Sequence, residues 1–232
     1  MKKILFVIVI MAIGLKVYAF DDLWKKAQSY AEKSWNLVPG VMTQTNIMKD
    51  QKTDEVNMNM YLKIAIKQND FGFIDNELIE ATVNDQKVDE NTPEIKKLIE
   101  VDRTPSRKGM FLIYNKDDIT IKKLRETSEI NGIKVSKYEV KYSMLDNDNK
   151  KQTLEGIVWL DSQNGRPVLS DMKMAKTPMF VQSIDIKTYY GFNNNTETFF
   201  QEKVEMDVQI SAMGQKISNN TVIEMRNYWT YN

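Results

Sequence analysis

Residues 153–190 read TLEGIVWLDSQNGRPVLSDMKMAKTPMFVQSIDIKTYY, a pattern that predicts three β-strands joined by short turns. Strand-forming residues fill the run Leu154–Leu160. A polar turn follows and ends at Gly165, which accepts a positive φ without a Cβ clash. Pro167 lacks an N–H and therefore suits the start of the next strand. In this strand the apolar and charged side chains take opposite faces. Val168, Met172 and Met174 share one face, and Asp171 and Lys173 share the other. The stretch therefore predicts a half-buried antiparallel meander.

Outward from this stretch, alternating apolar residues predict further strands on both sides. Asn131-Gly132 is a two-residue hairpin signal between two of them. The expected extended runs are 41–47, 56–66, 73–83, 111–114, 119–124, 133–142, 204–212 and 217–229. Two expected apolar faces are Val56, Met58, Met60, Leu62, Ile64 and Ile66, and then Ile79, Ala81 and Val83. About ten strands result.

Two helices are predicted, both in the first half of the chain. The first begins at Asp21-Asp22, whose carboxylates suit a helix N-terminus, and ends near Asn36. It either packs on the sheet or forms a lid over a cavity. The second begins with Thr92 as N-cap and Pro93 at the first position. The basic loop Arg103–Gly109 either covers the open side of the sheet or only connects strands.

The composition excludes several classes of chemistry. The 232 residues contain no His and no Cys. Disulfides, zinc–thiolate sites, and Ser-His-Asp or Cys-His catalysis are therefore excluded. The length fits one or two domains, and the uniform texture favours one.

Residues 1–19 resemble a secretory signal peptide. Lys2-Lys3 precedes an apolar run that is too short to span a bilayer, and Val17-Tyr18-Ala19 fits a cleavage site. We therefore expect cleavage after Ala19 and a periplasmic location, with a retained N-terminal anchor as the alternative. Cleavage removes three lysines and leaves 29 basic residues against 32 acidic ones, a net charge of −3. Such a charge disfavours nucleic-acid binding.

Several short motifs resemble those of the outer-membrane lipoprotein-sorting (LolA/LolB-like) superfamily, and more closely of uncharacterised periplasmic lipoprotein-sorting-like proteins. The motifs are G-x-V-W-L-D at Gly156–Asp161, the turn ending in Gly165, Arg166-Pro167, the strand ended by Pro178, and N-G-I-K-V-x-x-Y-E-V at Asn131–Val140. The resemblance covers most of residues 20–232 and departs at 226–232. It implies a single half-barrel domain with helices in the concave side, where such proteins shelter lipoprotein acyl chains. No cargo-gating residue of the family matches a position here.

With that resemblance, the expected fold is α+β: a strongly curved antiparallel sheet, an incomplete β-barrel of about ten strands, with two helices covering its concave face. Such a face holds many methionines, whose unbranched side chains adapt to varied apolar shapes. The candidate cavity lining is Met58, Met60, Leu62, Ile64, Met172, Met174, Met206 and Met225. The alternative is that these residues only fill gaps in a packed core.

Other chemistries have weaker signals. Met58-x-Met60 and Met172-x-Met174 carry thioethers that suit copper(I), although no His or Cys assists them. The start of a calcium loop at Asp146–Asp148 lacks the required glycine and distal glutamate. No carboxylate pair stands out for glycosidase-like catalysis. We therefore expect no metal, no cofactor and no catalytic residue.

The sequence as a whole favours a non-catalytic periplasmic carrier or binding protein for a lipid or lipidated protein. Its ligand would lie in an apolar cavity between the sheet and the helices. The alternative is a structural or interaction module with a packed core that docks a protein partner of the cell envelope. A continuous apolar hollow separates the first interpretation from the second.

Overall fold

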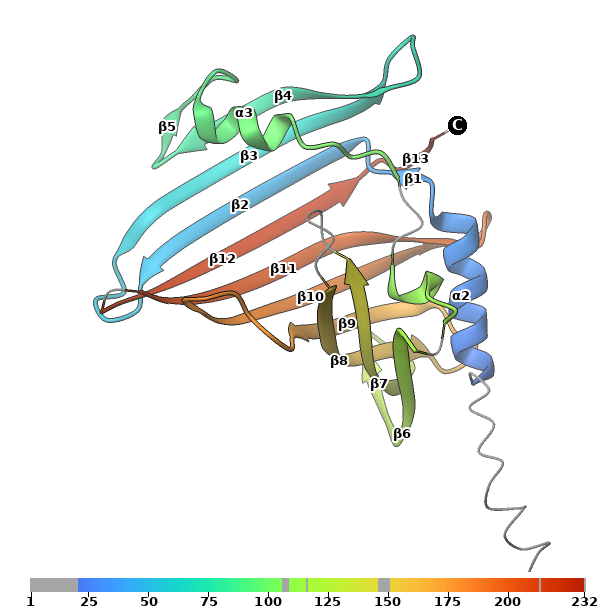
Figure 1. The fold of residues 1–232 in the computed structure, drawn as a ribbon. Coiled ribbons are helices and arrows are strands. Elements are labelled where there is room, and N and C mark those ends of the chain that lie inside the picture. The colour runs from blue at the N-terminus through green and yellow to red at the C-terminus, as the bar shows by residue number, and fades with distance from the viewer. Residues whose placement is uncertain (1–20, 106–108, 116, 146–150, 213, 232) are drawn as a thin grey trace, which may run out of the picture.

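The computed structural model describes residues 21–105, 109–115, 117–145, 151–212 and 214–231. The expected signal peptide and Asp146–Asp148 lie outside these residues. Within them, two α-helices and an eleven-stranded antiparallel sheet form the expected α+β fold. The sheet is curved and not closed into a barrel (Figure 1).

One continuous sheet contains all the long strands. They are β2 (Val41–Asp50), β3 (Val56–Gln68), β4 (Ile74–Val83), β5 (Gln86–Lys87), β6 (Ile119–Ile130), β7 (Ile133–Leu145), β8 (Lys151–Asp161), β9 (Pro167–Met174), β10 (Val181–Asn193), β11 (Thr198–Ala212) and β12 (Gln215–Arg226). Their order is β5-β4-β3-β2-β12-β11-β10-β9-β8-β7-β6. Consecutive strands pair from β2 to β5 and from β6 to β12, and β5 and β6 form the two edges. The pairing of β2 with β12 joins the two parts in mid-sheet.

The stretch that opens the sequence argument forms β8, β9 and the first part of β10, as predicted. Gly165 has a φ of +79° in the turn before Pro167. The hairpin between β6 and β7 is also confirmed, because Asn131 and Gly132 have φ values of 50° and 80°. Two positive values are what a two-residue turn needs to match the twist of its strands.

Both predicted helices are present. Helix α2 (Asp22–Ser34) begins after Asp21, whose carboxylate accepts a hydrogen bond of 2.9 Å from the backbone N–H of Leu23. Helix α3 (Pro93–Ile99) begins after Thr92, but the Thr92 side chain makes no capping hydrogen bond.

Two separate hydrophobic clusters make up the core. The α2 cluster is centred on α2, and its members are Trp24, Ala27, Ala31, Met110, Phe111, Ile119, Tyr138, Val140, Leu154, Val158, Leu160 and Met172. The α3 cluster lies between α3 and the other half of the sheet, and its members are Val38, Met42, Met60, Leu62, Ile64, Ile66, Ala81 and Ile95. Each helix therefore covers its own part of the sheet.

The extended run expected at Phe111–Tyr114 is wrong. Met110–Leu112 forms a short 3₁₀-helix, η1. The cause is tertiary packing, since the Phe111 ring lies 5.1 Å from Trp24 and 5.6 Å from Phe199, measured between ring centroids. The short helix therefore places the Phe111 ring among these aromatic side chains.

Two expected strand faces are corrected by β-bulges. In β4 the register shifts so that Ile64 pairs with Leu78 and Lys63 with Glu80, which turns Ile79 away from Ala81. Ile79 is accordingly 50% exposed. A similar shift beside Met48 leaves Val56 54% exposed at the start of β3. Bulges change which side a residue faces without changing the alternation in the sequence.

The last expected strand ends earlier than predicted. β12 stops at Arg226, and Asn227 has a φ of 57°. Trp229 lies in β13 (Trp229–Thr230), which pairs with β1 (Leu37–Val38) in a separate two-stranded sheet. Trp229 packs there against the α3 cluster.

Candidate functional site

The inner face of the sheet is the side that carries both hydrophobic clusters. Directly opposed residues of antiparallel strands share a face. The pairings trace one row from the α2 cluster to the α3 cluster through Met172, Ile186, Met206, Thr221, Asn46 and Met60. This row crosses β10, β11, β12 and β2.

All eight predicted lining residues lie on this inner face, but they divide into three sets. Met60, Leu62 and Ile64 belong to the α3 cluster, and Met225 packs against it. Met172 belongs to the α2 cluster. Met58, Met174 and Met206 are half-buried, and the described contacts place them in neither cluster. The predicted set is therefore part core and part open surface.

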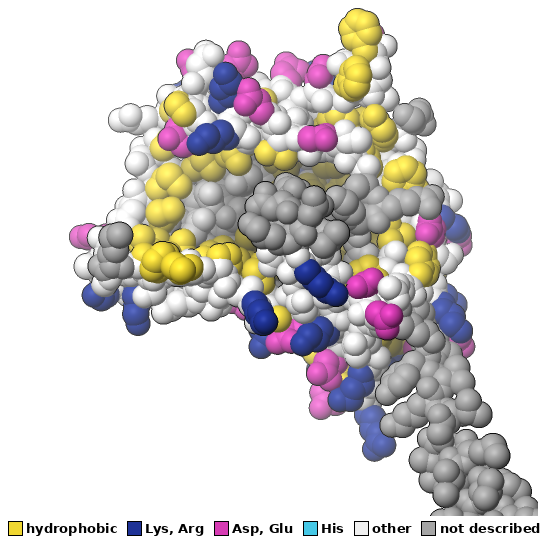
Figure 2. All heavy atoms as spheres, viewed as in Figure 1, with side chains coloured by type: hydrophobic (Ala, Val, Ile, Leu, Met, Phe, Trp, Pro, Cys, Tyr) yellow, Lys and Arg dark blue, Asp and Glu magenta, His cyan; other side chains and the backbone are white. Residues whose placement is uncertain are grey.

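An apolar surface lies between the two clusters, and we call it the open strip. Its members are half-buried: Met48, Met58, Met174, Ile184, Met206, Val208, Ile210 and Ile217. Helix α2 lies against β8 and β11, and α3 lies against β4. The contact of α2 with β11 includes Phe199, whose N–H donates to the Ser34 hydroxyl at 3.0 Å. Figure 2 shows hydrophobic side chains along the inner surface toward the end where β2, β3, β11 and β12 turn.

A small polar group interrupts the open strip. It consists of Asn46 on β2 and of Asn219 and Thr221 on β12, all on the inner face. Thr221 donates a hydrogen bond to the Asn46 side-chain carbonyl. The Asn219 side-chain carbonyl is buried and has no hydrogen-bond partner among the described residues. Asn219 and Thr221 fall within the expected strand 217–229, but no pattern in the sequence indicated a site role for them or for Asn46.

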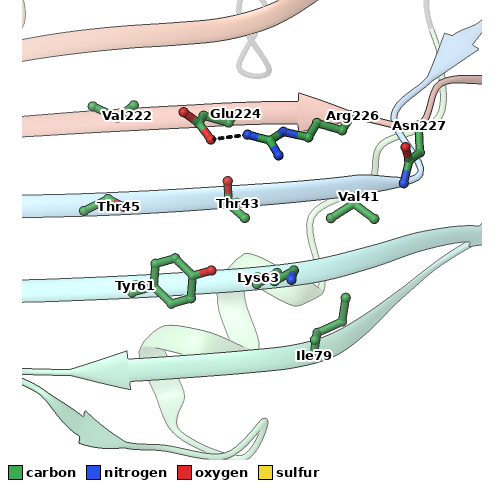
Figure 3. Close-up of a pocket in the computed structure, with 10 residues that line it drawn as sticks. All are labelled: Val41, Thr43, Thr45, Tyr61, Lys63, Ile79, Val222, Glu224, Arg226 and Asn227. Carbon is green, nitrogen blue, oxygen red and sulfur yellow. Dashed lines mark hydrogen bonds and ion pairs between the residues drawn. The ribbon is translucent and has the colours of Figure 1, made fainter.

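A hollow of about 620 Å³ lies on the opposite, outer face (Figure 3). Its lining residues are Val41, Thr43, Thr45, Tyr61, Lys63, Ile79, Val222, Glu224, Arg226 and Asn227. Arg226 and Glu224 form an ion pair at 3.3 Å within β12. None of the eight predicted lining residues belongs to it, and the bulge in β4 places Ile79 there.

A second hollow of about 390 Å³ crosses β9 to β12. Its lining combines the outer-face residues Asp171, Asp185 and Asp207 with Ile186 and the predicted residue Met206. The described residues hold no group of three or more His, Cys, Asp or Glu side chains that could bind a metal ion. The two Met-x-Met pairs lie on β3 and β9, so four strands separate them. No described helix has the length and apolar character to span a membrane.

Three groups with perturbed pKa values, Asp21, Tyr138 and Tyr190, belong to the α2 cluster or contact it. Burial alone would raise the pKa of Asp21, but hydrogen bonds from Tyr138, Lys123 and the Leu23 N–H outweigh it and lower this pKa. Burial and the hydrogen bond to Asp21 raise the pKa of Tyr138. Burial raises the pKa of Tyr190 to about 12. The contacts of Asp21 with Tyr138 and Lys123 hold the start of α2 on the sheet, and both tyrosine hydroxyls stay protonated at neutral pH.

No protein-family model matches the chain, and no curated protein matches it. Among solved structures, a LolA superfamily protein from Nitrosomonas europaea is similar, with 10% identity, a TM-score of 0.32, and coverage of 88% of this chain and 92% of that chain. A structure of MucB in complex with MucA(peri) has 9% identity and a TM-score of 0.26 over 89% and 100% of the two chains. The Pseudomonas aeruginosa MucA/MucB complex has 8% identity and a TM-score of 0.25 over 91% and 100%.

Proposed function

We propose that the protein is a non-catalytic carrier or binding protein for a lipid or a lipidated protein, whose acyl chain lies along the open strip. One observation carries the proposal. A row of half-buried apolar side chains crosses the inner face between two clusters that each have their own helix. An apolar sheet surface left between covered regions is typical of a site for an apolar ligand.

The energetics of the open strip suit an acyl chain. Burying apolar groups stabilises a complex by roughly 0.8 kcal/mol per methylene. Three of the eight predicted residues, Met58, Met174 and Met206, belong to the open strip. Their thioether side chains adapt to chains of different shape. Affinity then needs no charged contact, which is consistent with a strip made of Met, Ile and Val.

The proposal includes the cellular location. We infer that residues 20–232 act as a single domain in the periplasm after removal of residues 1–19. The support is the order of charged, apolar and small residues at the N-terminus. N-terminal sequencing of the protein from its own host tests it: a chain that begins at Phe20 agrees, and a chain that retains residues 1–19 contradicts it.

Displacement of a fluorescent fatty acid tests the binding site. Met206→Asp places a charge in the open strip and should weaken binding at least tenfold, because the acyl chain would have to desolvate a carboxylate. The matched control is Thr45→Asp, which adds the same charge on the outer face. Equal binding by the wild type and Met206→Asp, or absence of binding by the wild type, contradicts the proposal.

A second candidate function is protein docking through the outer face. The hollow of about 620 Å³ supports it, because it combines an aromatic ring, Tyr61, with the cations Lys63 and Arg226. Aromatic and arginine side chains are common at the centres of protein interfaces. Under this function, Tyr61→Ala abolishes cross-linking to one specific envelope protein while Met206→Asp does not. If Tyr61→Ala keeps the cross-link and Met206→Asp loses fatty-acid binding, the carrier function is favoured.

A further inference from the structure

The open strip is long in the direction that crosses the strands. Antiparallel pairing places one inner-face residue of each strand in a single row from β9 to β3 (Figure 1). On β9, Lys173 pairs with Asp185, so the next residue, Met174, lies beside Ile184. The members of this row are Met174, Ile184, Val208, Asn219, Met48 and Met58.

The same strip is narrow in the direction along the strands. On β2 and β12 polar residues flank it on both sides: Thr221 donates a hydrogen bond to Asn46, and Asp50 pairs with Ile217. Asn219 interrupts the row on β12, where Ile217 supplies the apolar side chain on the same face. An α-helix with its side chains is about 10 Å across and needs a wider apolar surface. The shape of the strip therefore fits a single extended chain.

The two ends of the row differ. At one end Met174 pairs with Leu154 on β8, which is 7% exposed in the α2 cluster. At the other end the pairing of β3 with β4 stops at Met60 and Val83, and the exposed β4–β5 turn follows. A chain that enters at β3 therefore meets the covered α2 cluster when it reaches β9.

We propose that the open strip measures the length of its ligand, a single straight acyl chain that lies across the strands. The inference rests on the proposed function and narrows it. Neighbouring strands lie about 4.8 Å apart, so the six strands from β9 to β3 span about 24 Å. An extended chain with C–C bonds of about 1.5 Å advances by about 1.25 Å per carbon. The row therefore holds about 19 carbons, and one strand spacing corresponds to about four carbons.

Straight saturated carboxylic acids of about 10 to 24 carbons test the inference in competition with a fluorescent fatty acid. The affinity of the wild type should rise about fourfold with each added methylene that lies in the strip. It should stop rising near 19 carbons, because further methylenes extend beyond the row. Met174→Asp places a charge at the β9 end and should lower this limit by about four carbons. Its affinity for an acid of about 12 carbons should equal that of the wild type, because so short a chain does not reach β9.

Ala175→Asp is the matched control, since Ala175 is exposed just beyond β9, and it should keep the wild-type limit. If the affinity of the wild type rises up to the longest acid, or if Met174→Asp keeps the wild-type limit, the inference is overturned and the carrier function stands. If no acid of any length binds, both fail. The length limit of the wild type decides the question even if Met174→Asp does not fold.

Discussion

At the scale of single residues, Asp21 links three parts of the fold. Its carboxylate accepts hydrogen bonds from the Leu23 N–H at 2.9 Å, the Tyr138 hydroxyl at 2.7 Å and the Lys123 ammonium at 3.0 Å. The first contact caps α2, and the other two reach β7 and β6. One side chain therefore fixes both the start of α2 and its position on the sheet.

Asp21→Ala should lower the free energy of unfolding by about 2–3 kcal/mol, because it removes a helix cap and leaves the Tyr138 hydroxyl without its acceptor. Urea unfolding measures the change. Asp22→Ala is the control, since the Asp22 side chain is 95% exposed and its ion pair with Lys25 is worth little. Equal losses in the two variants would show that the contacts of Asp21 are unimportant.

The free energy of unfolding should depend on pH through the Asp21 carboxylate. The pKa of Asp21 is lower in the folded state, so its ionised form stabilises the fold above its unfolded pKa, which is about 4. This contribution is lost as the pH falls through the folded pKa. Asp21→Asn keeps a capping oxygen but no charge. The free energy of unfolding of Asp21→Asn should be lower than that of the wild type at pH 7, and the difference should disappear in strong acid. A difference that does not change with pH would show that the charge of Asp21 does not stabilise the fold.

Gly156 in β8 is required by close backbone packing. A Cβ at this position would lie 2.0 Å from the backbone oxygen of Asp171 and 2.8 Å from the Cα of Met172. Gly156→Ala should therefore displace β9 and destabilise the protein by about 3 kcal/mol or more. Gly109→Ala is the matched control, because no atom of the described residues lies within 4 Å of its added Cβ. Similar thermal midpoints for Gly156→Ala and the wild type would contradict this packing.

The sequence alone could not identify the polar residues of the candidate site. Asn46, Asn219 and Thr221 come together only through the pairing of β2 with β12, which are about 170 residues apart in the chain. Similarly, the sequence did not single out Trp24, which is fully buried in the α2 cluster. Its role depends on Phe111 and Tyr138, whose positions depend on tertiary packing.

At the scale of elements, the period of two predicted most of the strands because alternation follows directly from half-burial. It predicted faces correctly only where the register is regular. The bulges next to Met48 and Ile64 turned Val56 and Ile79 outward, and no residue type in the sequence marks these bulges. The predicted apolar faces therefore needed correction at their ends and not at their centres.

Met58 and Met60 share one face of β3 but differ in what covers them. Met60 is 4% exposed in the α3 cluster, and Met58 is half-buried in the open strip. Met60→Ala should cost about 2–5 kcal/mol of stability by leaving a cavity. Met58→Ala should cost about 1 kcal/mol or less but weaken binding of the fluorescent fatty acid. Urea unfolding measures the stability of both variants, and titration with the fluorescent fatty acid measures their binding. A larger loss of stability in Met58→Ala than in Met60→Ala would contradict the placement of Met60 in the core and Met58 in the open strip.

At the scale of the whole molecule, the arrangement of two clusters explains how the protein combines a stable fold with an open surface. The α2 cluster stabilises the β6–β9 end of the sheet, and the α3 cluster stabilises the β2–β4 end. Strands β10 to β12 connect the ends and carry most of the open strip (Figure 1). The sequence predicted a curved sheet with two helices; it did not predict that each helix would form its own cluster, so that neither described helix covers the middle of the sheet.

Native mass spectrometry of the protein purified from its own host decides whether the open strip holds an acyl chain. We expect the wild type to carry a species whose mass and fragments identify an acyl-chain compound, and Met206→Asp purified in the same way to lack it. If the wild type carries no acyl compound, and takes up none when lipids of its host are added, the protein is not an acyl-chain carrier.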